Sequence, residues 1–302
     1  MASQTWIPGR RFVIGVPYTW LLVFFLLPFL ILFYISFVDM GEDIIPFKPL
    51  WDASGALHLK LENYWSIFRE SGGGEWFNTI YIEAYGRSIA YALVTATLCL
   101  VIGYPFAYFL ARAPERVRPG LLMLVMLPFW TSFLLRVYAW KGLLSDFGLI
   151  NKAMMALHLI KDPIPMLYTD VSMLVGMTYV YLPFMVLPLY ATLVKLDYRL
   201  LEAAYDLGTR PFKAFWLITV PLSRAGIVAG FMLVFIPSVG EFVIPSLLGG
   251  PENIMIGRVV WDEMFTSNNW PRATALAVLM IALIVVPLAM YNRAVNRKEV
   301  AA

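Results

Sequence analysis

Charged residues are scarce in this chain of 302 residues. Asp, Glu, Lys and Arg together make up only 14% of the chain, hydrophobic residues make up 60%, and the mean hydropathy is +0.72. A typical soluble domain carries about 25% charged residues. The composition therefore predicts a membrane protein.

Histidine and cysteine are nearly absent: the chain has only His58, His158 and Cys99. Three such residues are too few for a typical His/Cys metal site, and one cysteine cannot form an internal disulfide. An excess of basic charge is also missing, because 23 Lys and Arg face 20 Asp and Glu. These deficits exclude a metalloenzyme and a protein that holds a nucleic-acid backbone.

Long apolar stretches, in contrast, are abundant. A helix needs about 20 apolar residues to cross the hydrocarbon core of a bilayer. Six stretches meet this criterion, and we predict spans at about 12–38, 86–111, 119–138, 170–194, 224–248 and 272–292. The first is longer than the apolar part of a signal peptide and is expected to be retained.

Basic residues indicate the orientation of these spans. With a cytoplasmic N-terminus, the cytoplasmic segments hold thirteen Lys and Arg, whereas longer outer segments hold eight. Cytoplasmic loops of membrane proteins carry such an excess. We therefore predict one membrane domain, 1–302, with both termini in the cytoplasm, a long outer loop at 39–78 and a cytoplasmic loop at 195–223.

The cytoplasmic loop 195–223 is expected to form two short helices. Asp197 is a suitable N-cap for a helix over 198–207, and Gly208 can close it in the left-handed conformation. Thr209 can then cap a second helix that has Pro211 in its first turn. Apolar residues recur at helical spacing in both helices.

The same loop carries a spaced sequence pattern. Glu202-Ala203-Ala204 is followed after three residues by Gly208, after nine more by Ile218, and then by Pro221. This spacing resembles the EAA loop of binding-protein-dependent ABC importers, with Val220 where the family pattern has Leu. We call residues 195–223 the EAA loop. The stretches 127–140 and 238–260 resemble permease subunits of polyamine (spermidine/putrescine) importers, and the resemblance extends over about 11–293.

The resemblance implies an all-α membrane protein with the type I ABC importer permease (MetI-like) fold and cytoplasmic EAA coupling helices. It implies a subunit of the bacterial inner membrane that takes up putrescine or spermidine and performs no catalysis. The implied partners are a second permease subunit, two ATPase subunits and a periplasmic or extracytoplasmic binding protein. The chain has no G-x-x-x-x-G-K-[ST] loop, so ATP and Mg are expected on the ATPase subunits and no cofactor on this chain.

A polycation pathway should offer carboxylates and aromatic faces. Glu241 lies inside the fifth apolar stretch, where a carboxylate is costly unless it meets a partner or water. Pro237, Gly240 and Pro245 are expected to break this helix, so Glu241 either faces the pathway or accepts hydrogen bonds from freed backbone N–H groups. The aromatic candidates for the pathway are Tyr179, Tyr181 and Trp130.

Three other functions remain open at this stage. An opine or amino-acid derivative could replace the polyamine. A channel or secondary transporter would leave the pattern from Glu202 to Pro221 without a purpose. An intramembrane enzyme would need a nucleophile–base pair or a metal site, and none of the six apolar stretches contains histidine.

Overall fold

The computed structural model describes residues 9–41, 46–51, 58–69 and 79–300. Over these ranges the chain is mainly helical, and Met40 and Phe47 form an isolated antiparallel bridge. The chain divides into two compact units. The first unit is Met1–Ile82 with Val260–Ala302, and the second is Glu83–Val259.

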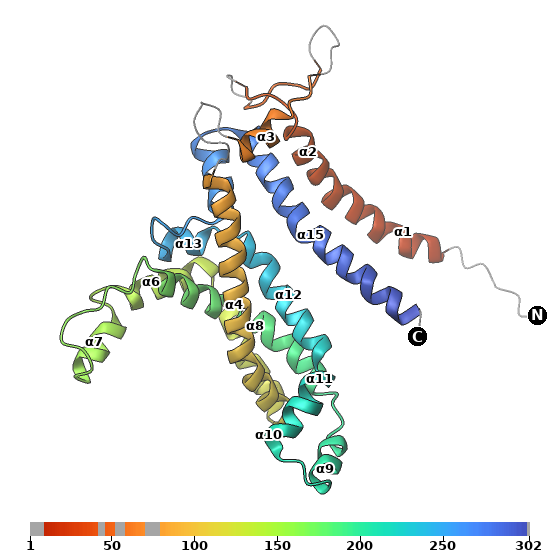
Figure 1. Cartoon of the computed structure of the whole chain (residues 1–302), viewed down its shortest axis with the longest axis vertical. Helices are drawn as coiled ribbons and strands as arrows, with labels where there is room; N and C mark the ends of the chain where they lie inside the picture. The colour runs from red at the N-terminus through yellow and green to blue at the C-terminus, as the bar shows by residue number, and fades with distance from the viewer. Residues whose placement is uncertain (1–8, 42–45, 52–57, 70–78, 301–302) are drawn as a thin grey trace, which may run out of the picture. The chain divides into compact units, whose positions relative to one another are not determined.

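The first unit holds the N-terminal and C-terminal helices. Its elements are α1 (Gly9–Leu21), the π-helical turn η1 (Leu22–Leu26), α2 (Leu27–Ile35), α3 (Glu62–Phe68), the π-helical turn η4 (Asp262–Thr266) and α15 (Trp270–Val300). Helix α15 contacts both α2 and α3 (Figure 1). The stretch Phe12–Ile35 is long and apolar enough to cross a bilayer, and nearly all of its side chains are exposed. It therefore offers an apolar surface to lipid or to another helix.

Polar side chains tie α3 to the end of α2. The Asn63 side-chain amide donates to the carbonyls of Ser36 at 3.1 Å and Val38 at 2.8 Å. The hydroxyls of Ser36 and Tyr64 share a hydrogen bond of 2.7 Å. Burial raises the pKa of the Tyr64 phenol above its ordinary value, so the phenol stays protonated at neutral pH.

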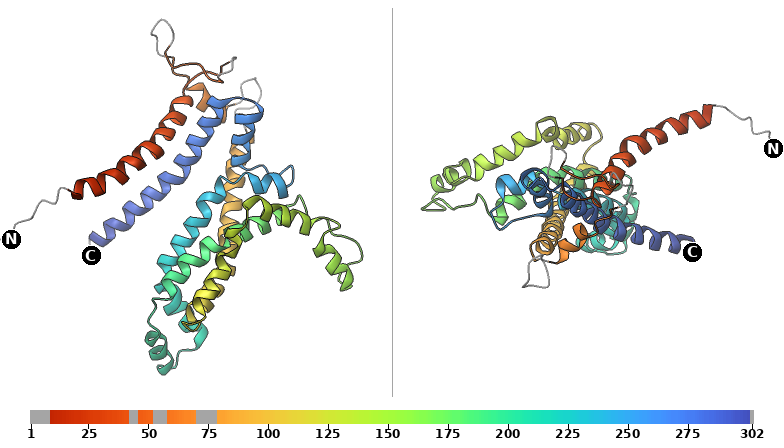
Figure 2. Two further views of the ribbon diagram at one scale, coloured as in Figure 1. Left: turned by 180° about the vertical axis from the view of Figure 1, so that it is seen from behind. Right: turned by 90° about the horizontal axis from the view of Figure 1, so that it is seen from above.

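The second unit is built around three long helices. Its elements are α4 (Thr79–Arg112, whose first four residues belong to the first unit), α5 (Arg118–Met126), the 3-10 turn η2 (Leu127–Trp130), α6 (Phe133–Leu144), α7 (Leu149–Ala156), α8 (Asp170–Leu193), α9 (Arg199–Asp206), α10 (Pro211–Ala214), the π-helical turn η3 (Phe215–Thr219), α11 (Val220–Leu222), α12 (Arg224–Val239), α13 (Val243–Leu248) and α14 (Ile256–Trp261, which crosses into the first unit). Helices α4, α8 and α12 lie side by side (Figures 1 and 2).

Close packing of α8 and α12 depends on two glycines. A Cβ on Gly226 would lie 2.6 Å from Thr192 Oγ1 and 2.9 Å from the Pro188 carbonyl oxygen. A Cβ on Gly230 would lie 2.8 Å from Met185 Sδ. The small-xxx-small spacing of these glycines thus lets two helix backbones approach each other, as it does in many membrane proteins.

The predicted third span is broken. The helix over Arg118–Trp130 ends before Thr131 and Ser132, and the helical stretch Phe133–Ala156 leaves it at an angle of 88°. Thr131 has extended backbone angles, and its hydroxyl donates to the Pro128 carbonyl at 2.8 Å. Local hydrogen bonding therefore replaces the helical ladder at this point, and 119–138 is not one straight helix.

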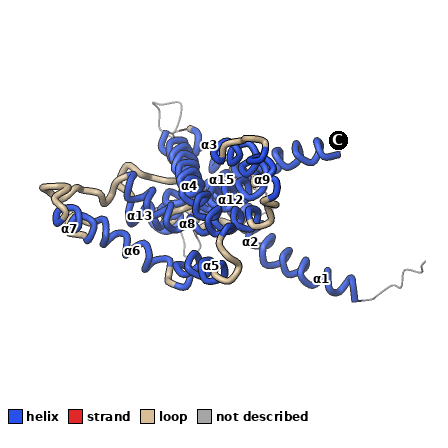
Figure 3. The backbone as a smooth tube through the Cα atoms, turned by 90° about the horizontal axis from the view of Figure 1, so that it is seen from below, coloured by secondary structure: helices blue, strands red, loops and turns tan. Residues whose placement is uncertain are grey.

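Beyond this break, α6 and α7 form an arm that extends away from α8 (Figure 3). Asn151 in α7 is fully buried and stabilises the arm. Its amide donates to the carbonyls of Ser145 at 3.3 Å and Ile164 at 2.9 Å, and accepts from the Ile164 N–H at 3.1 Å.

Three helices of the described part are long and apolar enough to cross a membrane, and up to five if each of two sharply bent pairs counts as one span. The second bent pair joins Pro211–Leu222 to Arg224–Val239 at 68°. The last apolar stretch, Trp270–Val286 within α15, is too short to count as a membrane span by the same criterion.

Candidate functional site

The EAA loop folds into two short helical segments. The first is α9, and the second runs from α10 through η3 to α11 (Figure 1). The predicted start is close to the observed one: Asp197 Oδ1 accepts from the Arg199 N–H at 3.0 Å, although Tyr198 is the N-cap residue. The prediction for Thr209 is wrong by one residue, because Arg210 is the N-cap of the second segment and makes no side-chain capping bond.

Gly208 ends α9 in the left-handed conformation, with φ of 80°. Its N–H donates to the Tyr205 carbonyl at 2.8 Å, and the Thr209 N–H donates to the Ala204 carbonyl at 2.9 Å. These two bonds form a Schellman motif, which satisfies the last carbonyls of a helix. The sequence-based expectation for the conformation of Gly208 is confirmed.

The two segments present an exposed surface. Glu202 and Ala203 are exposed on α9, whereas Leu201 is buried beneath them. Leu207 is 86% exposed and Phe212 is 76% exposed. Apolar side chains this exposed at a loop tip are typical of a surface that binds a partner.

The remaining positions of the EAA pattern lie deeper. Ala204 on α9, Ile218 in η3 and Pro221 in α11 are each half-buried. The exposed positions Glu202, Ala203 and Gly208 are therefore accessible to a partner, and the half-buried positions pack within the second unit.

A second candidate site lies at Gly240–Phe242, where the fifth apolar stretch is broken between α12 and α13. Glu241 occupies this break and is only 8% exposed. Its Oε1 accepts from the backbone N–H groups of Phe242 at 3.1 Å, Val243 at 3.0 Å and Ile244 at 3.4 Å. The carboxylate thus caps α13, where anions are favoured by the helix dipole and by unpaired N–H groups.

Tyr181 of α8 supplies the fourth hydrogen bond of this carboxylate. Its hydroxyl donates to Glu241 Oε2 at 2.5 Å, a distance typical of a charge-assisted bond. Glu241 has no ion-pair partner within the described ranges. The site is therefore a buried carboxyl group that is held by four hydrogen bonds, with no cationic side chain paired to it in the described part of the chain.

Backbone from α14 closes over the break. A Cβ on Gly257 would lie 2.3 Å from the Gly240 carbonyl oxygen and 2.8 Å from that of Glu241. A side chain does not fit at this position, so glycine is required for the close approach.

The other two aromatic candidates lie elsewhere. Tyr179 packs edge-on against Trp140, with ring centroids 5.5 Å apart, and lines an apolar cavity of about 200 Å³ between α4, α5 and α8. Trp130 is 73% exposed in η2. The structure thus brings Tyr181 to Glu241. Among the described residues, no hydrogen bond or ring contact joins Tyr179 or Trp130 to that pair.

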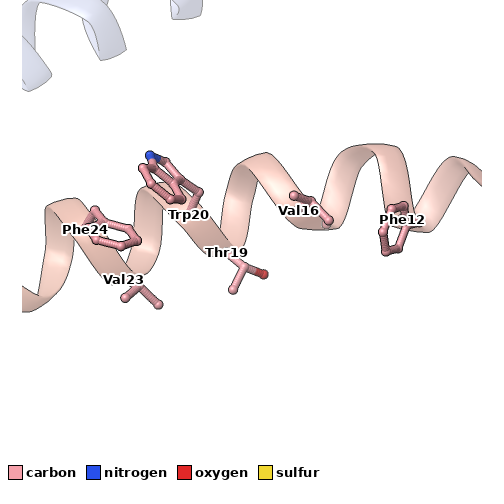
Figure 4. Close-up of a pocket in the computed structure, with 7 residues that line it drawn as sticks. Phe12, Val16, Thr19, Trp20, Val23 and Phe24 are labelled. Atoms are coloured by element: carbon pink, nitrogen blue, oxygen red, sulfur yellow. The ribbon is translucent and has the colours of Figure 1, made fainter.

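A shallow groove runs along one face of α1 and η1 (Figure 4). It is lined by Phe12, Gly15, Val16, Thr19, Trp20, Val23 and Phe24. All these residues belong to one continuous helical stretch, so the groove is the space between side chains of a single helix surface.

The sequence model of one family matches residues 102–300, which include the EAA loop and the Glu241 break. This family is described as the inner membrane component of binding-protein-dependent transport systems. The chain belongs to this family.

Several relatives of this transport component are similar over nearly their full length. The spermidine/putrescine transport system permease protein PotB of Haemophilus influenzae is 34% identical, with 96% of each chain covered. The protein of the same name from Escherichia coli strain K12 is 37% identical, with 91% of this chain and 94% of the relative covered.

Solved structures support the fold. A bacterial ABC transporter involved in the import of the acidic polysaccharide alginate matches with a TM-score of 0.64 at 16% identity, with 96% of each chain covered. A second structure of a bacterial alginate ABC transporter, in complex with an alginate pentasaccharide-bound periplasmic protein, gives the same values. At this identity the likeness concerns the fold alone.

Two features of this transport component were not predicted from its sequence. Phe215 contacts the rings of Tyr104 and Tyr108 on α4. The only signal in the sequence is the four-residue spacing of the two tyrosines, which places them on one face of a helix. Arg136 has its Nε and Nη1 atoms buried without a hydrogen-bond partner among the described residues. Its guanidinium lies over the Phe129 and Phe133 rings instead.

Proposed function

We propose that this chain is a membrane-spanning subunit of an ABC importer that takes up putrescine or spermidine. The observation that carries this proposal is the 34–37% identity with spermidine/putrescine permeases over more than nine tenths of both chains. Matches of this length compare most of this chain with most of each relative, and not one segment alone.

We propose six membrane spans with both termini in the cytoplasm. The spans would be α1 to α2, α4, the bent pair of α5 and α6, α8, the broken pair of α12 and α13, and α15. Apolar length supports the first, second and fourth of these. The excess of Lys and Arg next to the proposed cytoplasmic ends supports the orientation.

The EAA loop would bind an ATPase subunit. Glu202 and Ala203 stand on an exposed helix face, and the apolar side chains of Leu207 and Phe212 extend this surface. A small residue beside a carboxylate allows close approach together with charge-assisted hydrogen bonds. Gly208 fixes the turn between the two contacting segments.

Glu241 would contribute negative charge to the translocation pathway, with Tyr181 holding the carboxylate in place. A hydrogen-bonded carboxylate without an ion-pair partner can attract an ammonium group without giving up another cation. Tyr179 and Trp130 are the further aromatic candidates for cation–π contact. The pathway itself would form between this chain and a second permease subunit.

In this proposal the chain performs no catalysis. ATP and Mg would bind to two ATPase subunits, and the solute would arrive on a periplasmic or extracytoplasmic binding protein. Affinity for one polyamine over another would then depend on the binding protein as well as on the pathway.

The test is the ATPase activity of the intact complex in liposomes, purified through a tag on this chain. We expect binding protein loaded with spermidine or putrescine to stimulate hydrolysis severalfold over unloaded binding protein, with uptake of the radiolabelled polyamine. The control is the same polyamine-loaded binding protein added to liposomes that lack the complex. Absence of both stimulation and uptake with both polyamines would refute the proposal.

A further inference from the structure

The EAA loop contacts one stripe of α4 from both of its ends. Before α9, the Tyr198 ring lies 5.2 Å from the Arg112 guanidinium. After α10, the Phe215 ring meets Tyr104 at 5.4 Å and Tyr108 at 5.8 Å, both edge-on. Because Tyr104, Tyr108 and Arg112 are four residues apart, they lie on one face of α4.

Aromatic rings also connect Phe215 to the exposed surface of the loop. Phe212 packs against Trp216 at 6.3 Å, and Trp216 packs against Phe215 at 5.4 Å. Phe212 and Trp216 are exposed, whereas Phe215 is half-buried. A continuous series of rings therefore leads from the loop surface to α4.

The backbone offers no comparably straight connection to α12. The second segment contains the π-helical turn Phe215–Thr219, and its axis changes by 68° where α12 begins after Ser223. The Ser223 hydroxyl shares a 2.8 Å hydrogen bond with the Tyr104 hydroxyl. A sharp break of this kind interrupts the helical ladder, so even the hinge residue is tied to α4.

We infer that Phe212, Trp216 and Phe215 form an aromatic relay through which displacement of the EAA loop reaches α4, with Phe215 as its positioning residue. The inference rests on the proposed binding of an ATPase subunit to this loop. Once a bound ATPase subunit covers Phe212 and Trp216, displacement at this surface can travel through side chains that are packed against one another. Here those side chains are rings that meet edge-on, and each such pair is worth about 0.5–1.5 kcal/mol.

Cys99 provides a native reporter of movement in α4. It is the one cysteine of the chain, it is fully buried, and it lies five residues before Tyr104 on the same helix. Its rate of modification by methyl methanethiosulfonate can be followed by mass spectrometry of its peptide. This readout requires ATP binding to the complex but does not depend on which solute is transported.

The experiment compares Phe215→Leu with Phe235→Leu in the intact complex. Phe235 is a matched control, because it packs against Phe231 at 6.2 Å on α12 and takes no part in the relay. Tyr108→Leu removes a ring from the α4 side and replaces Phe215→Leu if that variant does not assemble. Each complex is labelled with and without ATP, Mg and vanadate, and uptake of spermidine and of putrescine is measured in parallel.

In the wild type and Phe235→Leu, we expect nucleotide to change the Cys99 labelling rate by about threefold or more. A ratio of this size corresponds to the free energy of about one aromatic pair. In Phe215→Leu this response should disappear and uptake should fall about tenfold, the equivalent of two pairs. The ATPase subunits should still copurify.

Three outcomes would overturn the relay: no nucleotide response at Cys99 in the wild type, a full response in Phe215→Leu, or an equal loss in Phe235→Leu. A response that is lost in Phe215→Leu, in a complex that transports neither polyamine, would support the relay and refute the proposed substrate.

Discussion

The Tyr181 hydroxyl donates a 2.5 Å hydrogen bond to Glu241 Oε2, which joins the middle of α8 to the break between α12 and α13. The other carboxylate oxygen accepts from three backbone N–H groups. Four hydrogen bonds thus replace the water that this anion loses in an apolar environment. The arrangement stabilises both the charge of Glu241 and the shape of the break.

Replacement of Tyr181 should therefore destabilise the protein through a single hydrogen bond. Tyr181→Phe leaves Oε2 of the buried carboxylate without its donor, and a hydrogen bond to a charged group contributes about 1.5–3 kcal/mol. We expect a lower thermal unfolding midpoint of the purified complex in detergent. Tyr179→Phe is the matched control, because no hydrogen bond of that hydroxyl occurs in the described part of the chain. Equal midpoints for the two variants would contradict the prediction.

Charge at Glu241 can be separated from its capping role. In Glu241→Gln the side-chain carbonyl can still accept from the N–H groups of α13, and the Tyr181 hydroxyl can turn to accept from the new amide. We expect the complex to assemble normally and putrescine uptake to fall about tenfold, which corresponds to about 1.4 kcal/mol of lost attraction for the ammonium groups.

The control for this variant is Glu83→Gln, which removes an equally negative side chain that is exposed and pairs with Arg87 at 3.5 Å. Exposed pairs contribute little, so uptake should stay near the wild-type rate. If Glu241→Gln also transports at the wild-type rate, its carboxylate serves the break alone and is not part of the pathway.

Local features of both sites could be predicted from sequence because neighbouring residues determine them. The left-handed turn at Gly208 follows from glycine after a helical stretch, and the break around Glu241 follows from a carboxylate and glycine inside an apolar run. The ion pair between Glu83 and Arg87 follows from their four-residue spacing.

Contacts between distant segments could not be predicted in this way. Tyr181 and Glu241 are 60 residues apart, and an almost uniformly apolar helix gives no periodicity that indicates which tyrosine faces the core. The bend after Trp130 was also missed, because Thr131 and Ser132 are uncharged and interrupt the apolar run for only two residues while the backbone turns. Hydropathy therefore locates membrane segments in this chain better than it predicts their shape.

Substitutions at Gly208 should distinguish backbone conformation from charge at the exposed loop surface. A Cβ at this position would meet no atom within 4 Å, so the cost within the chain is that of a left-handed residue, about 1–2 kcal/mol. Asn and Asp have the same shape and adopt this conformation more readily than other residues. We expect Gly208→Asn to retain uptake within about threefold of wild type, and Gly208→Asp to abolish uptake while membrane insertion stays intact.

The measurement is uptake together with copurification of the ATPase subunits. A larger defect in Gly208→Asp than in Gly208→Asn would show that a new negative charge disturbs a partner surface. Equal defects in both variants would assign the effect to the backbone, and normal uptake in Gly208→Asp would refute a role of this turn in coupling.

The contact between α8 and α12 should respond unequally to its two glycines. The added methyl group of Gly226→Ala would meet the rigid Pro188 carbonyl at 2.9 Å, whereas that of Gly230→Ala would first meet the flexible Met185 thioether at 2.8 Å. Overpacking of a tight core costs about 1–3 kcal/mol, and a thioether can move more easily than a backbone. We therefore expect the unfolding midpoint in detergent to fall more for Gly226→Ala than for Gly230→Ala.

Gly142→Ala in α6, where a Cβ has open space, should leave the midpoint unchanged or raise it slightly through better helix propensity. The reverse order of the first two variants would mean that Met185 and not the Pro188 backbone limits the approach of these helices.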